Sequence, residues 1–495
     1  MPAPTLPSDE RDAARWVAVV VGVLIFLMAA RTPLDSDLWW HLRTGEETLQ
    51  SGKPVLTDIF SFTRYGSPWI NHSWLGQVVL AGLYRLGGYT ALTVLVAGLA
   101  TLSLMLVYRQ MSAPPLWRAV VVILAGLVCA PLWTARPQLF SLALFALLLV
   151  LLPAFRTERL SPYLVLPPLF AVWSNLHGGY ALGFLLLGAT LAGQVMDRWL
   201  TPEHAPSWRG IARLAGASAL GFLAVALNPN GINMWKIPFQ TVGVQILRQA
   251  ISEWASPDFH DLTQQPFLWM LAGILLTLGI SRQRRPAETL LPVLLFTAMG
   301  LMARRNFAPF ALAAAPLLAS AGWEALQTAF APLSPHLKRY SGASRPVRAS
   351  LRRSINLTSV GLLAFAAFLK AGLVSHPALV EGAIRQYYPA DAVAWMEQHH
   401  PTGNLFNEYA WGGYLIWRLP QVPVFVDGRT DLYGDDLLKE WLTLVNAGED
   451  WQNLLEKHGI RLALISPDAP LRHALKQAGW QEQYADPIAV ILAKP

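Results

Sequence analysis

Apolar stretches long enough to cross a lipid bilayer recur along most of this chain of 495 residues. A membrane-spanning helix needs about 20 predominantly apolar residues. Only 14% of the residues are charged, whereas a soluble protein carries roughly 25%, and this deficit is expected if lipid surrounds most of the chain. We therefore predict a polytopic α-helical membrane protein with about eleven spans. The predicted spans are residues 16–31, 90–107, 117–133, 138–153, 162–174, 179–197, 211–227, 266–280, 288–303, 306–322 and 357–375.

The distribution of Lys and Arg predicts the orientation of these spans. The loop 323–356 contains six Lys and Arg residues against one acidic residue, Glu324, and Arg282, Arg284 and Arg285 form a second basic cluster. Short loops rich in Lys and Arg stay in the cytoplasm. The apolar segment 73–86 is too short to span and is predicted to be an interfacial or re-entrant helix. The N-terminus is then cytoplasmic, and residues 32–88 form one long outer loop.

The last part of the chain has a different character. Residues 376–495 contain 15 acidic and 9 basic residues, although the whole chain has a net charge of +7. Short β-type segments at 403–407, 422–426, 461–466 and 488–493 alternate with helical segments at 390–399, 433–445, 450–458 and 470–478. This alternation predicts a small α/β domain. We expect a transmembrane domain over 1–375 and an extracytoplasmic domain over 376–495.

Several classes of function are excluded by composition and motifs. The basic residues lie in short loops rather than on one folded face, so no nucleic-acid partner is predicted. The single cysteine, Cys129, lies in an apolar run, which excludes an intramolecular disulfide and gives no thiol metal site. The C-terminal domain has no glycine-rich nucleotide-binding motif and no serine-nucleophile motif.

Unusual polar and aromatic residues collect at the predicted outer ends of the spans. Polar groups at membrane depth are costly and usually mark a functional site. Arg136 can instead snorkel to the surface, Trp39 and Trp40 can be interfacial aromatics, and Arg304 and Arg305 can be interfacial anchors. The residues predicted to bind substrate on this side are Trp39, Trp40, His41, His72, Arg136, Asn175, His177, Arg304 and Arg305.

Asp35 and Asp37 carry the strongest chemical signal in the outer loop. Two carboxylates at positions i and i+2 can share one divalent cation, Mg²⁺ or Mn²⁺, and one of them can act as a general base. Asp37 can alternatively cap a helix that begins at Leu38. Glu253, in another outer loop, is a candidate second base or metal ligand.

The C-terminal domain has two notable segments, 407–417 and 427–433. Asp427-Gly428 follows a predicted strand and is a turn signal. Open α/β sheets place binding residues at such strand ends. We predict that this domain contacts substrate through Trp411, Tyr414, Asp427 and Arg429.

These features together resemble the GT-C superfamily of membrane glycosyltransferases, which includes oligosaccharyltransferases and protein mannosyltransferases. Asp35-Ser36-Asp37 occupies the position of the family's acidic motif, and the segments 408–414 and 427–430 resemble the oligosaccharyltransferase segments that recognise acceptors. The start of the chain, from Asp35 to Glu46, is also similar to bacterial multi-pass proteins of unassigned role.

The resemblance implies transfer of a sugar from a polyprenyl-phosphate-linked donor to an acceptor at the outer face of a bacterial inner membrane. It implies catalysis by Asp35, Asp37 and Glu253, with membrane lipids and a lipid-linked donor as partners. Two alternatives stay open. A transporter is expected to show internal repeats and midplane charges. A non-catalytic structural or assembly subunit would keep the fold and use the outer domain to dock partner subunits of a membrane complex.

Overall fold

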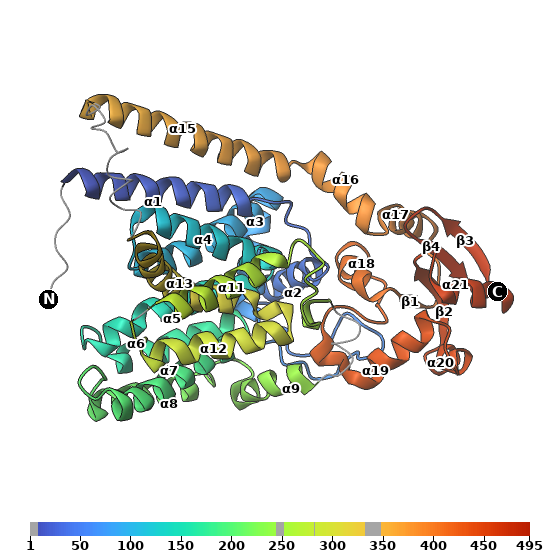
Figure 1. Cartoon of the computed structure of the whole chain (residues 1–495). Helices are drawn as coiled ribbons and strands as arrows, with labels where there is room; N and C mark the ends of the chain where they lie inside the picture. The colour runs from blue at the N-terminus through green and yellow to red at the C-terminus, as the bar shows by residue number, and fades with distance from the viewer. Residues whose placement is uncertain (1–7, 244–251, 282, 332–347) are drawn as a thin grey trace.

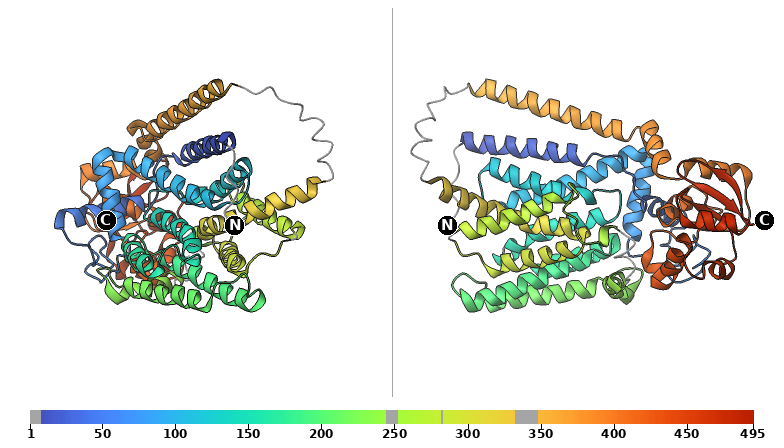
Figure 2. Two further views of the ribbon diagram at one scale, coloured as in Figure 1. Left: turned by 90° about the vertical axis from the view of Figure 1, so that its left-hand side faces the viewer. Right: turned by 45° about the vertical axis from the view of Figure 1, so that its right-hand side comes forward.

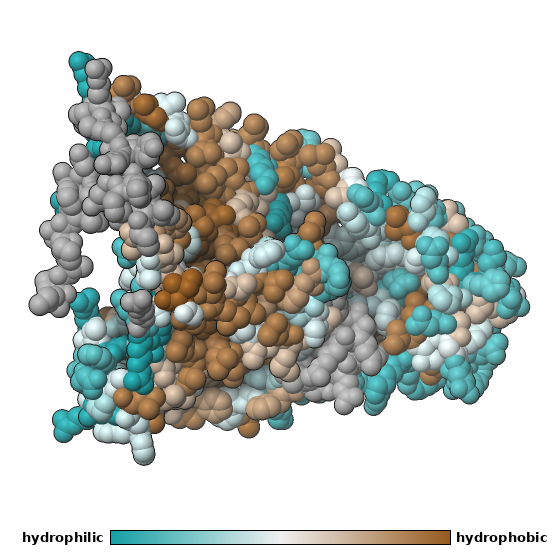
Figure 3. Space-filling view, viewed as in Figure 1, coloured by the Kyte–Doolittle hydropathy of each residue, from teal (hydrophilic) through white to brown (hydrophobic). Residues whose placement is uncertain are grey.

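The computed structural model describes residues 8–243, 252–281, 283–331 and 348–495. A bundle of long helices carries a smaller mixed domain at one end (Figure 1). The bundle presents a largely apolar surface and the C-terminal domain a largely hydrophilic one (Figure 3). Arg282 and residues 332–347 of the predicted basic loop lie outside the described residues.

Each predicted span falls on a helix of the bundle. Of the helices in the described ranges, seven are long and apolar enough to cross a membrane, namely α1, α3, α4 with the turn that follows it, α5, α7, α13 and α15, and α11 and α12 are shorter apolar helices. The total of eleven spans stays a prediction, because α6 and α8 have only 15 and 17 residues. The bundle helices are α1 (Ser8–Ala29), α3 (Trp74–Gln110), α4 (Pro115–Cys129), α5 (Gln138–Arg156), α6 (Pro162–Leu176), α7 (Tyr180–Leu200), α8 (Trp208–Ala224), α11 (Gln265–Ile280), α12 (Ala287–Met302), α13 (Phe307–Phe330) and α15 (Ala349–Val374).

The long outer loop begins with a short helix that packs against the start of α3. Helix α2 (Leu38–Ser51) crosses α3 closely, and a Cβ on Gly45 would lie 2.2 Å from the carbonyl oxygen of Gln77. Helix α3 breaks at Gly87 and Gly88, where Gly88 has φ 55°, a left-handed conformation that favours glycine. The break separates the segment predicted as an interfacial helix from the span that follows it.

The C-terminal domain contains a four-stranded sheet in the order β1-β2-β4-β3. Strands β1 and β2 are parallel, and the other two pairings are antiparallel. Buried apolar residues on both faces of the sheet form two clusters that the surrounding helices complete. The elements are β1 (Asn404–Asn407), β2 (Ile460–Ile465), β3 (Gln481–Ala485), β4 (Val490–Ala493), α16 (Pro377–Tyr387), α17 (Ala390–His399), α18 (Gly412–Arg418), α19 (Thr430–Val445), α20 (Trp451–Lys457) and α21 (Pro470–Gln477).

Two details of the predicted sheet are wrong. The segment 422–426 is not a strand of the sheet, because its backbone pairs with the outer loop: Val424 donates to the carbonyl oxygen of Phe60 at 3.0 Å and accepts from Phe62 at 3.1 Å. The side chain of Asn407 accepts from the N–H of Phe425 at 2.8 Å. Strand β3 was not expected, since its sequence is polar and mostly exposed, without an alternating apolar pattern.

A buried ion network joins the outer loop to the C-terminal domain. The guanidinium of Arg429 binds Asp58 and Asp427, each at 2.7 Å, and these side chains are 0% exposed. Tyr433 donates to Asp427 at 2.5 Å. The guanidinium also lies 5.1 Å from the ring of Phe60. The loop 32–88 and the C-terminal domain are therefore bound to each other, and the right-hand view in Figure 2 shows this assembly on one end of the bundle.

We predict that Arg429→Met destabilises the assembly of loop and domain by roughly 3–5 kcal/mol, because it leaves two buried carboxylates without their partner. Chemical denaturation in detergent, followed by limited proteolysis of the outer loop, measures the effect. Arg385→Ala is the matched control. Its ion pairs with Glu381 and Asp391 are about half exposed and are expected to contribute less than about 1 kcal/mol. Equal stability of the two variants would contradict a stabilising role of the ion network around Arg429.

Candidate active site

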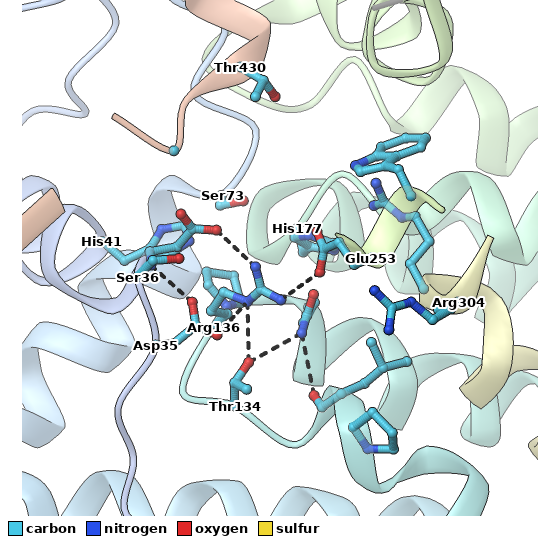
Figure 4. Close-up of a pocket in the computed structure, with 18 of the residues that line it drawn as sticks. Asp35, Ser36, His41, Ser73, Thr134, Arg136, His177, Glu253, Arg304 and Thr430 are labelled. Atoms are coloured by element: carbon cyan, nitrogen blue, oxygen red, sulfur yellow. Dashed lines mark hydrogen bonds and ion pairs between the residues drawn. The ribbon is translucent and has the colours of Figure 1, made fainter. Parts of the chain in front are cut away.

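A cavity of about 420 Å³ lies where the C-terminal domain, residues 376–495, meets the end of the bundle. We call this domain the outer domain because it lies beyond the end of the helix bundle (Figure 1). Figure 4 shows that segments distant in the sequence contribute side chains to it, including the outer loop, the turn before α5, the turn before α7 and the start of α19. Its lining includes the predicted residues Asp35, Asp37, Trp40, His41, His72, Arg136, His177, Glu253, Arg304 and Arg305. The structure thus brings together most of the residues that the sequence singled out.

Arg136 lies at the centre of the cavity's charged groups. Its Nη1 atom is 2.8 Å from Asp37, its Nη2 atom is 2.9 Å from Glu253, and its Nε atom is 3.3 Å from Asp35. The Nε–H also donates to the hydroxyl of Thr134 at 3.2 Å (Figure 4). Every nitrogen of the guanidinium therefore faces a carboxylate, and such charge-assisted contacts fix geometry strongly.

Asp37 occupies the N-cap position of α2, the position that the capping interpretation of the sequence gave it. Its side chain makes no capping hydrogen bond. One carboxylate oxygen instead accepts from Nε1 of Trp40 at 3.2 Å, and the other contacts Arg136. The neighbouring Asp35 accepts from the backbone N–H of Asp37 at 2.9 Å, which orients the pair. The side chain of Asp37 is thus directed into the cavity rather than onto the helix end.

The three carboxylates differ in electrostatic environment. Burial raises the pKa of Asp37 to about 6; Arg136 opposes this shift, and the negative charges of Asp35 and Glu253 add to it. Burial also acts to raise the pKa of Glu253, but Arg136, Arg305 and Arg304 together lower it below its ordinary value. A carboxylate with a pKa near the working pH is suited to general base catalysis, and Asp37 meets this condition.

Two arginines approach the cavity from the turn between α12 and α13. Arg304 and Arg305 lie in a short 3-10 helix, Arg304–Asn306. The guanidinium of Arg305 lies 4.0 Å from the ring of Trp254, a cation–π contact that holds it beside Glu253. The backbone N–H of Arg304 donates to the carbonyl oxygen of Ala255 at 3.2 Å. This turn supplies positive charge suited to an anionic group such as a phosphate.

Three histidines line the same cavity. Burial lowers the pKa of His41, His72 and His177; Arg136 adds to this effect at His41, Arg305 and Arg136 add to it at His177, and Asp431 opposes it at His72. The backbone N–H of Gly178 donates to Nδ1 of His72 at 3.3 Å, and that of Gly179 donates to Nδ1 of His177 at 3.0 Å. An Nδ1 atom that accepts leaves the proton on Nε2. His72 and His177 are therefore hydrogen-bond donors through Nε2.

The outer domain closes one side of the cavity through residues that the sequence analysis did not commit to. They are Tyr409, Gly428, Thr430 and Asp431. A Cβ on Gly428 would lie 1.9 Å from Oδ1 of Asp37, and one on Gly413 would lie 2.5 Å from the carbonyl oxygen of Ser36. Only glycine permits this approach. Gly413 lies in the segment 407–417 and Gly428 in the segment 427–433, the two notable segments of the C-terminal sequence. These segments were the sequence signal for this side of the cavity.

Six predicted binding residues do not line the cavity, which corrects their proposed direct contact with substrate. Trp39 is 1% exposed and packs edge-on against Tyr414, with ring centroids 5.3 Å apart. Trp411 and Tyr414 lie in the core of the outer domain. Asn175 bonds to Trp74 and to backbone carbonyls, and Asp427 and Arg429 belong to the buried network. These residues were predicted to bind substrate because of their positions in sequence motifs. In the structure the aromatic side chains pack in the core, and the polar and charged side chains bond to other parts of the protein.

The carboxylates were also predicted to hold a divalent cation. Within residues 8–243, 252–281, 283–331 and 348–495, no group of three or more His, Cys, Asp and Glu residues has the arrangement of a metal site. Asp35 and Asp37 each direct an oxygen atom at the guanidinium of Arg136, which occupies the position between them. The residues as arranged do not fit a divalent cation.

Comparison with known proteins identifies solved structures that have a similar fold. No protein-family model matches the sequence, and no curated protein matches it. Two solved structures of the Archaeoglobus fulgidus oligosaccharyltransferase do match. The apo form has a TM-score of 0.56 at 13% identity, covering 90% of this chain and 69% of that protein. A form tethered with an acceptor peptide containing the NVT sequon has a TM-score of 0.52 at 14% identity, covering 90% and 68%. The chain therefore has a fold similar to that of this oligosaccharyltransferase.

We predict that Gly428→Ala displaces the outer domain from Asp37, because the added Cβ has no room beside the carboxylate. Hydrogen exchange over residues 35–41 is expected to rise at least tenfold relative to the wild-type protein. Gly382→Ala, in helix α16 of the same domain, is the control, since a Cβ there would meet nothing within 4 Å. Unchanged hydrogen exchange in Gly428→Ala would show that the outer domain does not depend on the close contact between Gly428 and Asp37.

Proposed function

We propose that this protein transfers a glycosyl group from a polyprenyl-phosphate-linked donor to an acceptor at the outer face of the membrane. The observation that carries the proposal is the cavity in which Asp35, Asp37 and Glu253 surround Arg136, with Arg304 and Arg305 beside them. The GT-C-like fold supports it, because the structural match to the oligosaccharyltransferase covers 90% of this chain at a TM-score of 0.56.

The donor fits the side of the cavity formed by Arg304 and Arg305. The leaving group of a lipid-linked sugar is a phosphate at the membrane surface, and preorganised cations stabilise the charge that develops on it. These residues begin helix α13, which is part of the bundle. The lipid tail would then lie along the apolar helices while the sugar enters the cavity.

The acceptor fits the opposite side, against the outer domain. The tethered acceptor peptide in the matched structure belongs to that protein, and we extend to this chain only the idea that an acceptor enters beside its own outer domain. Tyr409, Thr430 and Asp431 present polar groups there. Nε1 of Trp69 donates to Asp431 at 3.3 Å, which fixes the position of that carboxylate.

The reaction proposed for these groups is a displacement at the anomeric carbon. The acceptor's oxygen or nitrogen forms the new bond to that carbon, and its proton passes to a carboxylate, for which Asp37 is best suited. The bond from the anomeric carbon to the phosphate oxygen breaks, and the electron pair leaves with the polyprenyl phosphate. Arg304 and Arg305 stabilise the departing anion, and Asp35 and Glu253 hold Arg136 in place.

The charges at one end of the bundle support an orientation. Arg156 and Arg198 lie in the last turns of α5 and α7, Arg209 in the first turn of α8, and Arg285 just before α12. These helix ends are on the side away from the outer domain (Figure 1). Short loops rich in arginine stay in the cytoplasm. We propose that the cavity and the C-terminal domain face outward from a bacterial inner membrane and that the N-terminus is cytoplasmic.

We predict that Asp37→Asn lowers the rate of sugar transfer about 100- to 10,000-fold, the range typical of a lost general base. The assay follows consumption of labelled polyprenyl-phosphate sugars by membranes that contain the protein, so that it does not depend on knowing the acceptor. Glu381→Gln, a half-exposed carboxylate on α16, is the control and should keep full activity. Full activity in Asp37→Asn would reject this site, and no transfer by the wild-type protein from any polyprenyl-phosphate sugar would favour a docking subunit.

A second prediction concerns pH. Because the pKa of Asp37 is raised to about 6, the base is protonated and inactive below that pH, so kcat/KM should fall tenfold per unit as the pH drops below it. Glu253→Gln removes a negative charge that raises this pKa, and its residual activity should therefore decline at a lower pH. A profile that is flat through pH 6, or a limb that Glu253→Gln does not move, would assign the proton to another group.

A further inference from the structure

The arrangement of carboxylates around Arg136 is that of ligands around a central cation. Asp35 and Asp37 come from one segment and Glu253 from another that is distant in sequence, and each presents one oxygen atom to a different nitrogen of the same guanidinium. The side chain of Arg136 is only 14% exposed. The carboxylates would repel one another strongly in such a setting without a positive charge between them.

The oxygen atoms that a divalent cation would need are already bonded. Asp35 accepts from the backbone N–H of Asp37 with one oxygen and contacts Arg136 with the other. Asp37 accepts from Trp40 with one oxygen and contacts Arg136 with the other. Mg²⁺ and Ca²⁺ require oxygen ligands at about 2.0–2.6 Å. The guanidinium fills the point where these oxygens converge.

We propose that the guanidinium of Arg136 takes the place of a divalent cation, so that this site holds its carboxylates without a metal ion. The role of the site in sugar transfer rests on the function proposed above, whereas the exchange of metal for arginine rests on the geometry alone. A guanidinium is permanently charged and has fixed donor directions. It therefore positions Asp35, Asp37 and Glu253 at any metal concentration, and Arg136 is a positioning residue.

Removal of the guanidinium should convert the cluster into a metal site. In Arg136→Met, an uncharged side chain that replaces the apolar stem but not the guanidinium leaves the three carboxylates facing one another, and one Mn²⁺ ion can then bind them. Arg136→Lys is the matched control, because its ammonium keeps a positive charge among the carboxylates. Arg136→Met combined with Asp37→Asn removes one ligand and should bind Mn²⁺ at least tenfold more weakly.

The experiment is a Mn²⁺ titration of purified full-length protein, followed by electron paramagnetic resonance of the free ion and by the melting temperature. We expect no specific Mn²⁺ binding by the wild-type protein or by Arg136→Lys. We expect one bound Mn²⁺, and a melting temperature that Mn²⁺ raises, in Arg136→Met alone. No sugar transfer is measured, so the outcome is independent of the proposed function.

Two outcomes would overturn the proposal. One is a Mn²⁺ ion bound by the wild-type protein and lost in Asp37→Asn, which would mean that the carboxylates hold a metal despite Arg136. The other is a folded Arg136→Met variant that binds no Mn²⁺. If Arg136→Met does not fold, the titration of the wild-type protein and of Asp37→Asn decides the question, and absence of binding by the wild-type protein supports the proposal.

Discussion

The ion cluster centred on Arg136 is the interaction on which the rest of the site depends. It joins the loop after α1, the turn before α5 and the short 3-10 helix Ser252–Trp254. Its side chains are only 11–29% exposed, and each nitrogen of Arg136 has a carboxylate partner. The cluster thus fixes the relative positions of three bundle segments and gives Asp37 the electrostatic environment of a base.

The outer domain completes this arrangement through close backbone contacts. Gly428 and Gly413 allow the domain to approach the segment that carries Asp37, because a side chain at either position would collide with it. The network of Arg429, Asp58 and Asp427 holds the outer loop to the same domain. The cavity is therefore a joint product of the bundle and the domain.

The sequence predicted the architecture and most of the polar lining because both depend on local signals. Apolar length gave the helices, and polar residues at helix ends gave Asp35, Arg136, His177 and Arg305 a common face. Roles were harder to predict than positions. Arg429 and Trp39 are of residue types that often bind ligands, but contacts with distant parts of the chain bury them. No local sequence pattern predicts such contacts.

The same limit explains the strand that was wrongly predicted and the role of Arg136. The segment 422–426 has a strand-like apolar sequence, but its pairing partner is the outer loop, more than 300 residues earlier in the chain. Arg136 read in isolation is compatible with a snorkelling side chain. Only the fold shows that three carboxylates from distant segments converge on it.

The proposed function requires that a lipid-linked sugar reacts in the cavity between the bundle and the outer domain. The most direct measurement is photo-crosslinking with a polyprenyl-phosphate sugar that carries a photoreactive group next to the phosphate, followed by mass spectrometry of the labelled peptides. We expect labelling of the segments that contain Trp254 and Arg304–Asn306, with loss of the label when excess unmodified donor competes. Labelling confined to the lipid-facing helices, with none at these two segments, would contradict it.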